Sequence, residues 1–191
     1  IYKNPYALEL GYRTSDDITT EIQAENTFEY QNELLSRIVG HTVQCYKPCT
    51  AEKEIHDDGY SWTVTSPEQN SILYGYCTYA IGNDLKLYID GILRTNYSIW
   101  SSYKTFQIGE GNTPSHIVQL KGTLQRSREI DGVFYYLDMQ EFRDVMREIS
   151  QNQVTTLNLQ DKYVKCEYTA QGNEMLLLTI PYDDGWTAYV N

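Results

Sequence analysis

The sequence predicts a mainly β fold, a β-sandwich that carries two short helices. Three observations lead to this prediction. The 191 residues include 18 tyrosines against 4 phenylalanines and 3 tryptophans, and tyrosine favours half-buried strands in which the ring packs while the hydroxyl stays in water. Short apolar segments recur between Gly, Pro and Asp turn signals, which is typical of a sandwich or jelly roll. Helical apolar spacing is clear in two segments.

The first fifty residues are expected to hold an extended, irregular segment over residues 1–27, followed by one helix. We predict this helix over about residues 28–39, with Thr27 as its N-cap and Gly40 at its end. Its apolar side chains fall largely on one face: Phe28, Leu34, Leu35, Ile38 and Val39. Residues 41–58 are expected to form a loop or short strands.

Residues 51–191 are expected to form the sandwich, of the jelly-roll or galactose-binding-like type. Strands are predicted before the second helix at Tyr60–Val64, Ile72–Ile81, Leu85–Ile89, Ile92–Thr95, Tyr103–Ile108, His116–Leu124 and Val133–Leu137. Two Asp-Gly pairs, Asp90-Gly91 and Asp131-Gly132, predict tight turns, because both central residues of such hairpin turns need a positive φ.

The second helix is predicted over about residues 139–150. Asp138 and Glu141 have the spacing of a capping box, and one apolar face follows with Phe142, Val145, Met146 and Ile149. Further strands are expected at Val154–Leu159, Tyr163–Thr169, Glu174–Ile180 and Gly185–Val190. We therefore expect a single domain over residues 1–191, excised from a longer protein because Asn191 falls inside an expected strand.

The charge balance excludes some classes of partner. There are 15 basic and 26 acidic residues, a net charge of −11. Nucleic-acid binding needs clustered Lys and Arg, so no nucleic-acid partner is expected. The longest apolar run, Met175–Ile180, is far shorter than the roughly 20 residues that span a membrane.

Four cysteines, Cys45, Cys49, Cys77 and Cys166, permit two disulfides in three pairings. Their spacing is not the CxxC of zinc sites. Free or buried thiols and a Cys45–Cys49 bridge both remain open.

The residues that commonly carry chemistry form no recognisable pattern. The three histidines, His41, His56 and His116, are far apart in the sequence. Three acidic pairs, Asp16-Asp17, Asp57-Asp58 and Asp183-Asp184, are interpreted as turn and cap residues. We assign no catalytic residue, no metal ligand and no cofactor.

The most distinctive segment runs from Ile180 to Asn191. Its Pro181-Tyr182-Asp183-Asp184-Gly185-Trp186 resembles the C-terminal Pro-Tyr-Asp-x-Gly-Trp signature of the YfhO family of bacterial polytopic membrane proteins. The opening Asn4–Tyr12 and the stretch Asn26–Leu35 also resemble family motifs, in the right order. Residues 45–170 resemble the family only in their general character and carry no specific family motif. Thr27 stands where the family has Pro, and the chain stops before the family's Gly-Lys.

This resemblance implies an extracytoplasmic soluble domain of a bacterial membrane protein similar to GT-C glycosyltransferases. Such proteins are implicated in adding sugars from undecaprenyl-phosphate donors to cell-envelope polymers such as lipoteichoic acid. We therefore expect a non-catalytic accessory domain. Its expected partners are the transmembrane helices of its own full-length chain and a cell-wall glycan or lipid-linked sugar. Tyr182, Asp183 and Trp186 are the candidate ligand-binding residues. We interpret Asp183 and Trp186 in the first place as turn and core residues, and only in the second place as part of a sugar-binding surface.

Two other classes of function stay open besides a role that only braces the membrane helices. A secreted carbohydrate-binding module would bind saccharides through Trp62, Trp100 or Trp186. A hydrolase would show turnover by the isolated domain.

Overall fold

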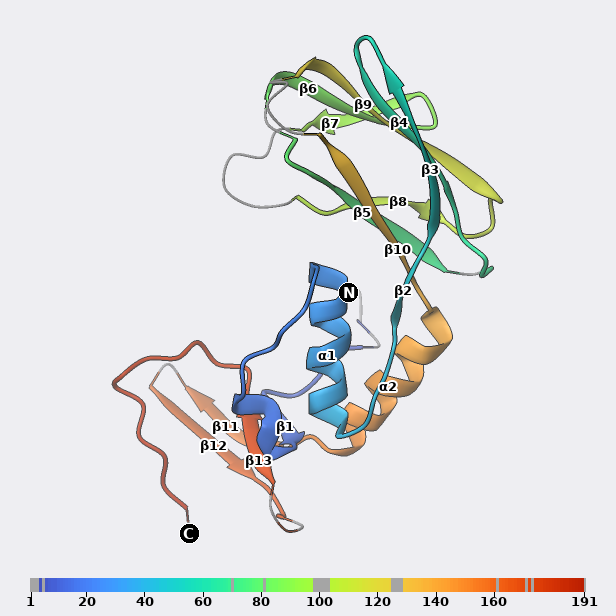
Figure 1. Cartoon of the computed structure of the whole chain (residues 1–191). Helices are drawn as coiled ribbons and strands as arrows, with labels where there is room; N and C mark the ends of the chain where they lie inside the picture. Colours follow the sequence, from blue (N-terminus) through green and yellow to red (C-terminus); the bar gives the residue numbers. More distant parts are fainter. Residues whose placement is uncertain are drawn as a thin grey trace. The chain divides into compact units, whose positions relative to one another are not determined.

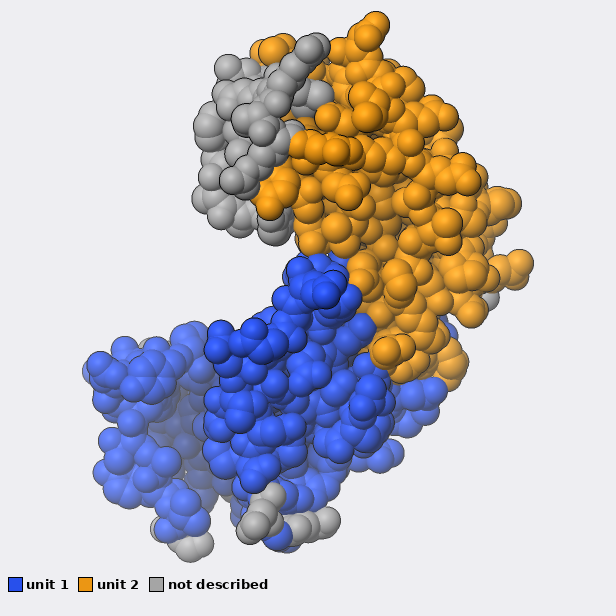
Figure 2. Space-filling model, in the orientation of Figure 1, with its two compact units in different colours: residues 1–43, 143–191 blue, residues 44–142 orange. Residues whose placement is uncertain are grey.

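The computed structural model describes residues 4, 6–69, 71–80, 82–97, 104–124, 129–160, 162–170, 172 and 174–190. The chain divides into two compact units (Figure 2). Unit 1 combines residues 1–43 with residues 143–191, and unit 2 is residues 44–142. The expected single domain over residues 1–191 stays a prediction, and the two units are described separately.

The described residues of unit 1 form these elements: β1 (Gly11–Thr14), the 3-10 helix η1 (Asp16–Thr19), α1 (Thr27–Val39), most of α2 (Met139–Gln151), β11 (Thr155–Gln160), β12 (Tyr163–Glu167) and β13 (Met175–Leu178). Those of unit 2 form β2 (Tyr46–Pro48), β3 (Thr50–His56), β4 (Gly59–Thr65), β5 (Ile72–Thr78), β6 (Gly82–Ile89), β7 (Ile92–Asn96), β8 (Phe106–Glu110), β9 (Ser115–Leu124) and β10 (Asp131–Leu137). Figure 1 shows both sets.

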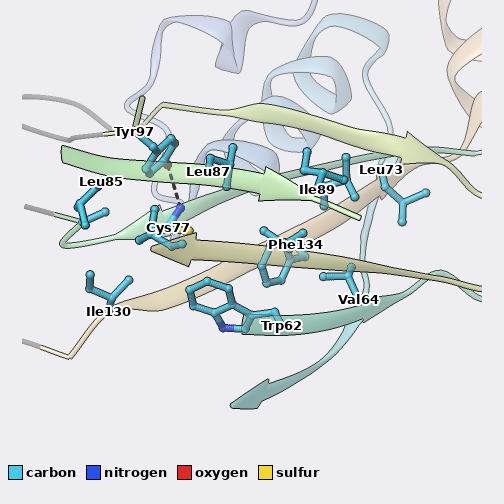
Figure 3. Packing of buried hydrophobic residues seen from close by; sticks show 14 of the residues in the cluster. Trp62, Val64, Leu73, Cys77, Leu85, Leu87, Ile89, Tyr97, Ile130 and Phe134 are labelled. Carbon is cyan, nitrogen blue, oxygen red and sulfur yellow. Dashed lines mark hydrogen bonds between the residues drawn. The ribbon is translucent and has the colours of Figure 1, made fainter. Parts of the chain in front are cut away.

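Unit 2 forms a β-sandwich, the predicted class of fold, but its sheets use only β2 to β10, whereas the sandwich was expected over residues 51–191. One antiparallel sheet has the order β2-β10-β5-β8 and the other the order β3-β4-β9-β6-β7. Apolar side chains of both sheets form one buried cluster (Figure 3). The alternation that predicted the strands supplies this core, since Trp62 and Val64 of β4 and Val118 and Leu120 of β9 all belong to it.

One strand segment joins the two sheets of the sandwich. β2 pairs with β10 in the first sheet, and β3 pairs with β4 in the second. Between them the Cys49 N–H donates to the Phe134 carbonyl at 2.9 Å. A strand that changes sheets makes a corner of a sandwich. The sequence predicted only a loop or short strands here.

Asp90-Gly91 forms the predicted hairpin turn between β6 and β7. Asp90 has φ 52° and Gly91 has φ 76°, as a two-residue turn of this kind requires. Asp57-Asp58 lies in the turn between β3 and β4, as interpreted from the sequence.

The turn predicted at Asp131-Gly132 is wrong, because both residues lie within β10. Asp131 pairs with Thr78 of β5, and its N–H donates to the Thr78 hydroxyl at 3.1 Å. Gly132 serves close packing instead. A Cβ there would meet the Phe134 ring at 2.4 Å and the Trp62 ring at 3.0 Å.

α1 confirms the first predicted helix, but Thr27 is not its N-cap. The Asn26 side chain accepts hydrogen bonds from the N–H groups of Phe28 and Glu29 at 2.9 and 3.1 Å. Thr27 is the first helical residue instead. Gly40 ends the helix in the left-handed conformation with φ 79°, as predicted.

α2 confirms the second predicted helix and half of its capping box. Asp138 Oδ1 accepts from the N–H groups of Gln140 and Glu141 at 3.0 and 3.1 Å. The reciprocal bond of a capping box is not formed. The Glu141 carboxylate accepts the Gln44 N–H at 2.6 Å, and the Asp138 N–H donates to the Cys45 carbonyl at 2.8 Å.

Unit 1 pairs the two ends of the chain. β1, which lies in a segment expected to be irregular, pairs antiparallel with β13. The Thr179 N–H extends this ladder to the Leu10 carbonyl at 2.7 Å. β11 and β12 form a separate antiparallel pair. Local sequence could not reveal β1, because its partner lies more than 150 residues away.

The strand predicted at Gly185–Val190 is wrong. Asp184 and Gly185 form a turn, and Trp186 to Val190 are neither helix nor strand. The Trp186 N–H donates to the Asp183 carbonyl at 3.0 Å. Among the described residues no strand pairs with this segment, and alternation without a pairing partner does not make a strand.

Candidate functional site

The three predicted ligand-binding residues lie on an exposed turn of unit 1. Tyr182 is 89% exposed and Trp186 is 43% exposed. Asp183 Oδ1 accepts the Gly185 N–H at 2.7 Å, and the Tyr182 hydroxyl donates to Asp184 Oδ1 at 2.8 Å. The turn is therefore organised by its own polar groups, as expected from the sequence, but the expected core role is wrong because these side chains are exposed. A ligand-binding role for Tyr182, Asp183 and Trp186 stays a prediction.

Trp62, a predicted sugar-stacking residue, lies in the core of the sandwich. Trp62 is 1% exposed. Its ring stacks on Tyr60 at 5.9 Å between centroids and meets Phe134 edge-on at 5.9 Å. It is a core residue and has no surface for stacking on a sugar. Trp100 lies outside the described residues.

All four cysteines are free thiols in the structure. Cys45 and Cys77 are fully buried. Burial raises the pKa of the Cys45 thiol to about 11 and that of Cys49 to about 12. Nucleophilic and metal-binding cysteines need the thiolate, so neither residue is suited to such chemistry.

The three histidines remain apart. His41 Nε2 lies 3.0 Å from the Glu148 carboxylate, His56 Nε2 lies 2.7 Å from the Ser61 hydroxyl, and His116 Nδ1 lies 2.7 Å from Asp90 Oδ2. Within the described ranges, no three His, Cys, Asp or Glu side chains converge into a metal site.

A polar cleft in unit 1 is a candidate site that the sequence did not reveal. Its volume is about 310 Å³. The cleft lies between the end of α2, the residues entering β11 and the end of β12. Its lining includes Arg13, Gln151, Asn152, Gln153, Thr155, Glu167, Tyr168 and Thr169. The three consecutive amides at residues 151–153 are the one sequence feature that could have marked it.

The backbone beneath this cleft is fixed to β1. The Arg13 N–H donates to the Asn152 carbonyl and the Val154 N–H donates to the Gly11 carbonyl, both at 2.9 Å. Tyr12 and Gln153 form an isolated β-bridge beside these bonds. The amide side chains of the cleft therefore project from an ordered segment.

An ion pair and two hydrogen bonds fix Arg13 and Tyr168 at the cleft. Arg13 Nη1 lies 3.0 Å from Glu174 Oε1, and Arg13 Nη2 donates to the Asn152 side chain. The Tyr168 hydroxyl donates to Glu174 Oε2 at 2.7 Å. Burial and this bond to Glu174 raise the pKa of Tyr168, so its hydroxyl stays protonated at neutral pH.

The comparison with protein families covers the entire chain. A family model described as "Bacterial membrane protein YfhO" matches residues 1–191. The chain belongs to the YfhO family. Neither a curated protein nor a solved structure matches it.

Membership in the YfhO family confirms the resemblance seen in the sequence and places this chain among bacterial membrane proteins. In the part of the chain that the structure describes, neither α1 nor α2 is long and apolar enough to cross a bilayer.

Proposed function

We propose that this chain is a non-catalytic accessory domain on the extracytoplasmic face of a polytopic membrane protein similar to glycosyltransferases. That protein would decorate cell-envelope polymers such as lipoteichoic acid. The observation that carries the proposal is the YfhO match over residues 1–191. The buried core of unit 2 supports it, because a well-packed sandwich can fold in water beside a membrane part.

The proposed partners are the transmembrane helices of the same full-length protein and a cell-wall glycan or lipid-linked sugar. The net charge of −11 opposes direct contact with an anionic polymer, unless a local site compensates for it. An uncharged sugar of the glycan or lipid-linked donor would be repelled less by this domain than an anionic part of the polymer.

Labelling of introduced cysteines in the intact membrane protein tests the proposed side of the membrane. Val190→Cys and Asp57→Cys place thiols on exposed positions of the two units. We expect both variants to react with a membrane-impermeant maleimide in intact cells. Both variants are made in a Cys49→Ser/Cys166→Ser background, which by itself is the control, because these two thiols are partly exposed whereas Cys45 and Cys77 are buried. Labelling that requires cell lysis would overturn the proposal.

A further inference from the structure

We propose that the polar cleft of unit 1, lined by Arg13, Gln153, Thr155, Tyr168 and Thr169, binds a neutral saccharide. This inference deepens the accessory role proposed above and rests on it for the biological source of the sugar. Its location is new, because the residues singled out in the sequence, Tyr182, Asp183 and Trp186, do not line this cleft.

The hydrogen-bonding groups of the cleft suit hydroxyl-rich ligands. Gln151 and Gln153 each carry an amide that can both donate and accept, and Thr155 and Thr169 carry hydroxyls that do the same. Gln153 uses its Oε1 to accept the Glu9 N–H at 3.0 Å, which orients the amide and leaves its NH₂ group as a donor. Sugar hydroxyls also donate and accept, so amides and hydroxyls pair with them without leaving a charge unmatched.

The electrostatics of the cleft favour a neutral ligand over an anion. Among the described lining residues, Arg13 is the one cation. Its guanidinium is already neutralised by Glu174 at 3.0 Å, and both groups are 21% exposed. Glu167 adds a further carboxylate to the lining. A phosphate would meet an arginine that already pairs with Glu174, together with the negative charge of Glu167, and both weaken anion binding.

Tyr168 gives the cleft an aromatic side chain for stacking. Its hydroxyl is held by Glu174 at 2.7 Å, so the ring loses little rotational freedom when a ligand binds. An aromatic ring has an apolar face that can pack on the apolar face of a pyranose, and Tyr168 lines the cleft together with the amides of Gln151 and Gln153. The cleft thus combines a fixed ring with a polar rim.

Calorimetric or ligand-observed NMR titration of the full 191-residue chain tests this proposal. The probes are maltotriose, cellotriose and chitotriose, with trigalacturonate and inorganic phosphate as anionic comparisons. We expect saturable binding of at least one neutral probe and weaker binding of both anions. Thr155→Val and Tyr168→Ala should each weaken that binding about fivefold or more, the effect of one lost hydrogen bond or stacking contact.

Matched variants separate the cleft from the rest of the chain. Thr63→Val makes the same change at an exposed strand position of unit 2 and should leave affinity unchanged. Tyr168→Phe keeps the ring and should retain more affinity than Tyr168→Ala. Because Thr155 is exposed, its variant should fold even if Tyr168→Ala does not.

Three results would overturn the proposal. They are the absence of binding by every neutral probe, tighter binding of an anion than of any neutral probe, and binding that is lost in Trp186→Ala but not in Thr155→Val. The accessory role would survive each of these results, since cysteine labelling in cells tests it separately.

Discussion

At the scale of single residues, one ring and two glycines organise the centre of the sandwich. Phe134 of β10 lies opposite Gly75 of β5 in the antiparallel register. A Cβ on Gly75 would meet the Phe134 ring at 2.5 Å, and one on Gly132 would meet it at 2.4 Å. The absence of two side chains therefore makes room for Phe134 against Trp62. Gly132 matters for packing rather than for a turn.

Gly132→Ala should destabilise the protein by about 1–3 kcal/mol, the usual cost of overpacking a core. Urea unfolding at neutral pH measures this free energy. The same substitution in a Phe134→Leu background should cost less, because the smaller side chain gives space to the new methyl group. Equal costs in the two backgrounds would contradict the proposed contact.

At the scale of elements, each helix start depends on one side-chain oxygen. Asn26 caps α1 and Asp138 caps α2, each through hydrogen bonds to two backbone N–H groups of the first turn. These groups have no partner within a helix, so a cap contributes directly to stability.

Asn26→Ala should cost about 1 kcal/mol of unfolding free energy, as expected for loss of an N-cap. Thr27→Ala is the matched control, since the sequence alone favoured Thr27 as the cap. We expect Thr27→Ala to change stability by less than half as much. Thermal or urea unfolding of both variants decides between the two residues, and a larger loss in Thr27→Ala would refute the observed cap.

Asp138 should also make stability depend on pH. Burial alone would raise the pKa of its carboxyl, but hydrogen bonds from Lys47 and from the Glu141 N–H outweigh burial and hold it below the ordinary 3.8. A carboxyl with a lower pKa in the folded state stabilises the fold above its unfolded pKa. This contribution is therefore lost as pH falls from about 3.8 through the lower folded value.

Asp138→Asn should keep an oxygen for the cap but lose the charge. Compared with the unchanged protein, this variant should therefore unfold more easily at neutral pH and lose less stability when the pH falls. Asp138→Ala should lose the cap as well and be the less stable of the two by about 1 kcal/mol. Urea unfolding at about pH 7 and about pH 3 checks this. Asp57→Asn, in an exposed turn, is the control. An unchanged pH dependence in Asp138→Asn would count against the assignment.

At the scale of the whole molecule, the chain leaves unit 1 after Val43 and re-enters it within α2. Unit 2 is therefore continuous, whereas unit 1 is assembled from both ends of the chain. The apolar cluster formed by both sheets lies entirely within unit 2. A continuous segment with its own core can fold by itself.

Residues 44–142 expressed alone should unfold in one cooperative transition. Circular dichroism during heating measures this transition. Before heating, the spectrum should be dominated by the β-strand signal expected from β2 to β10. Trp62→Ala in this fragment should remove about 3–5 kcal/mol and abolish or sharply lower the transition. A fragment without a cooperative transition would show that unit 2 depends on unit 1.

Features decided by neighbouring residues could be predicted from the sequence. The helices follow from apolar spacing and from Gly40 and Asp138 at their ends, and the turn follows from the Asp90-Gly91 pair, which adopts the two positive φ angles that such a turn needs. Terminal motifs also identified the YfhO family, because signature residues need no structure to be seen. These features depend on interactions within a few positions along the chain.

Only the tertiary structure decided features that depend on distant partners. Gly132 lies in a strand because β5 pairs beside it, and β1 exists because β13 returns to it from the other end of the chain. The polar cleft of unit 1 joins Arg13 to residues 151–153, 155 and 167–169. No local pattern encodes such features, because a strand's backbone groups and a cleft's walls are completed by segments that lie more than fifty residues away in the sequence.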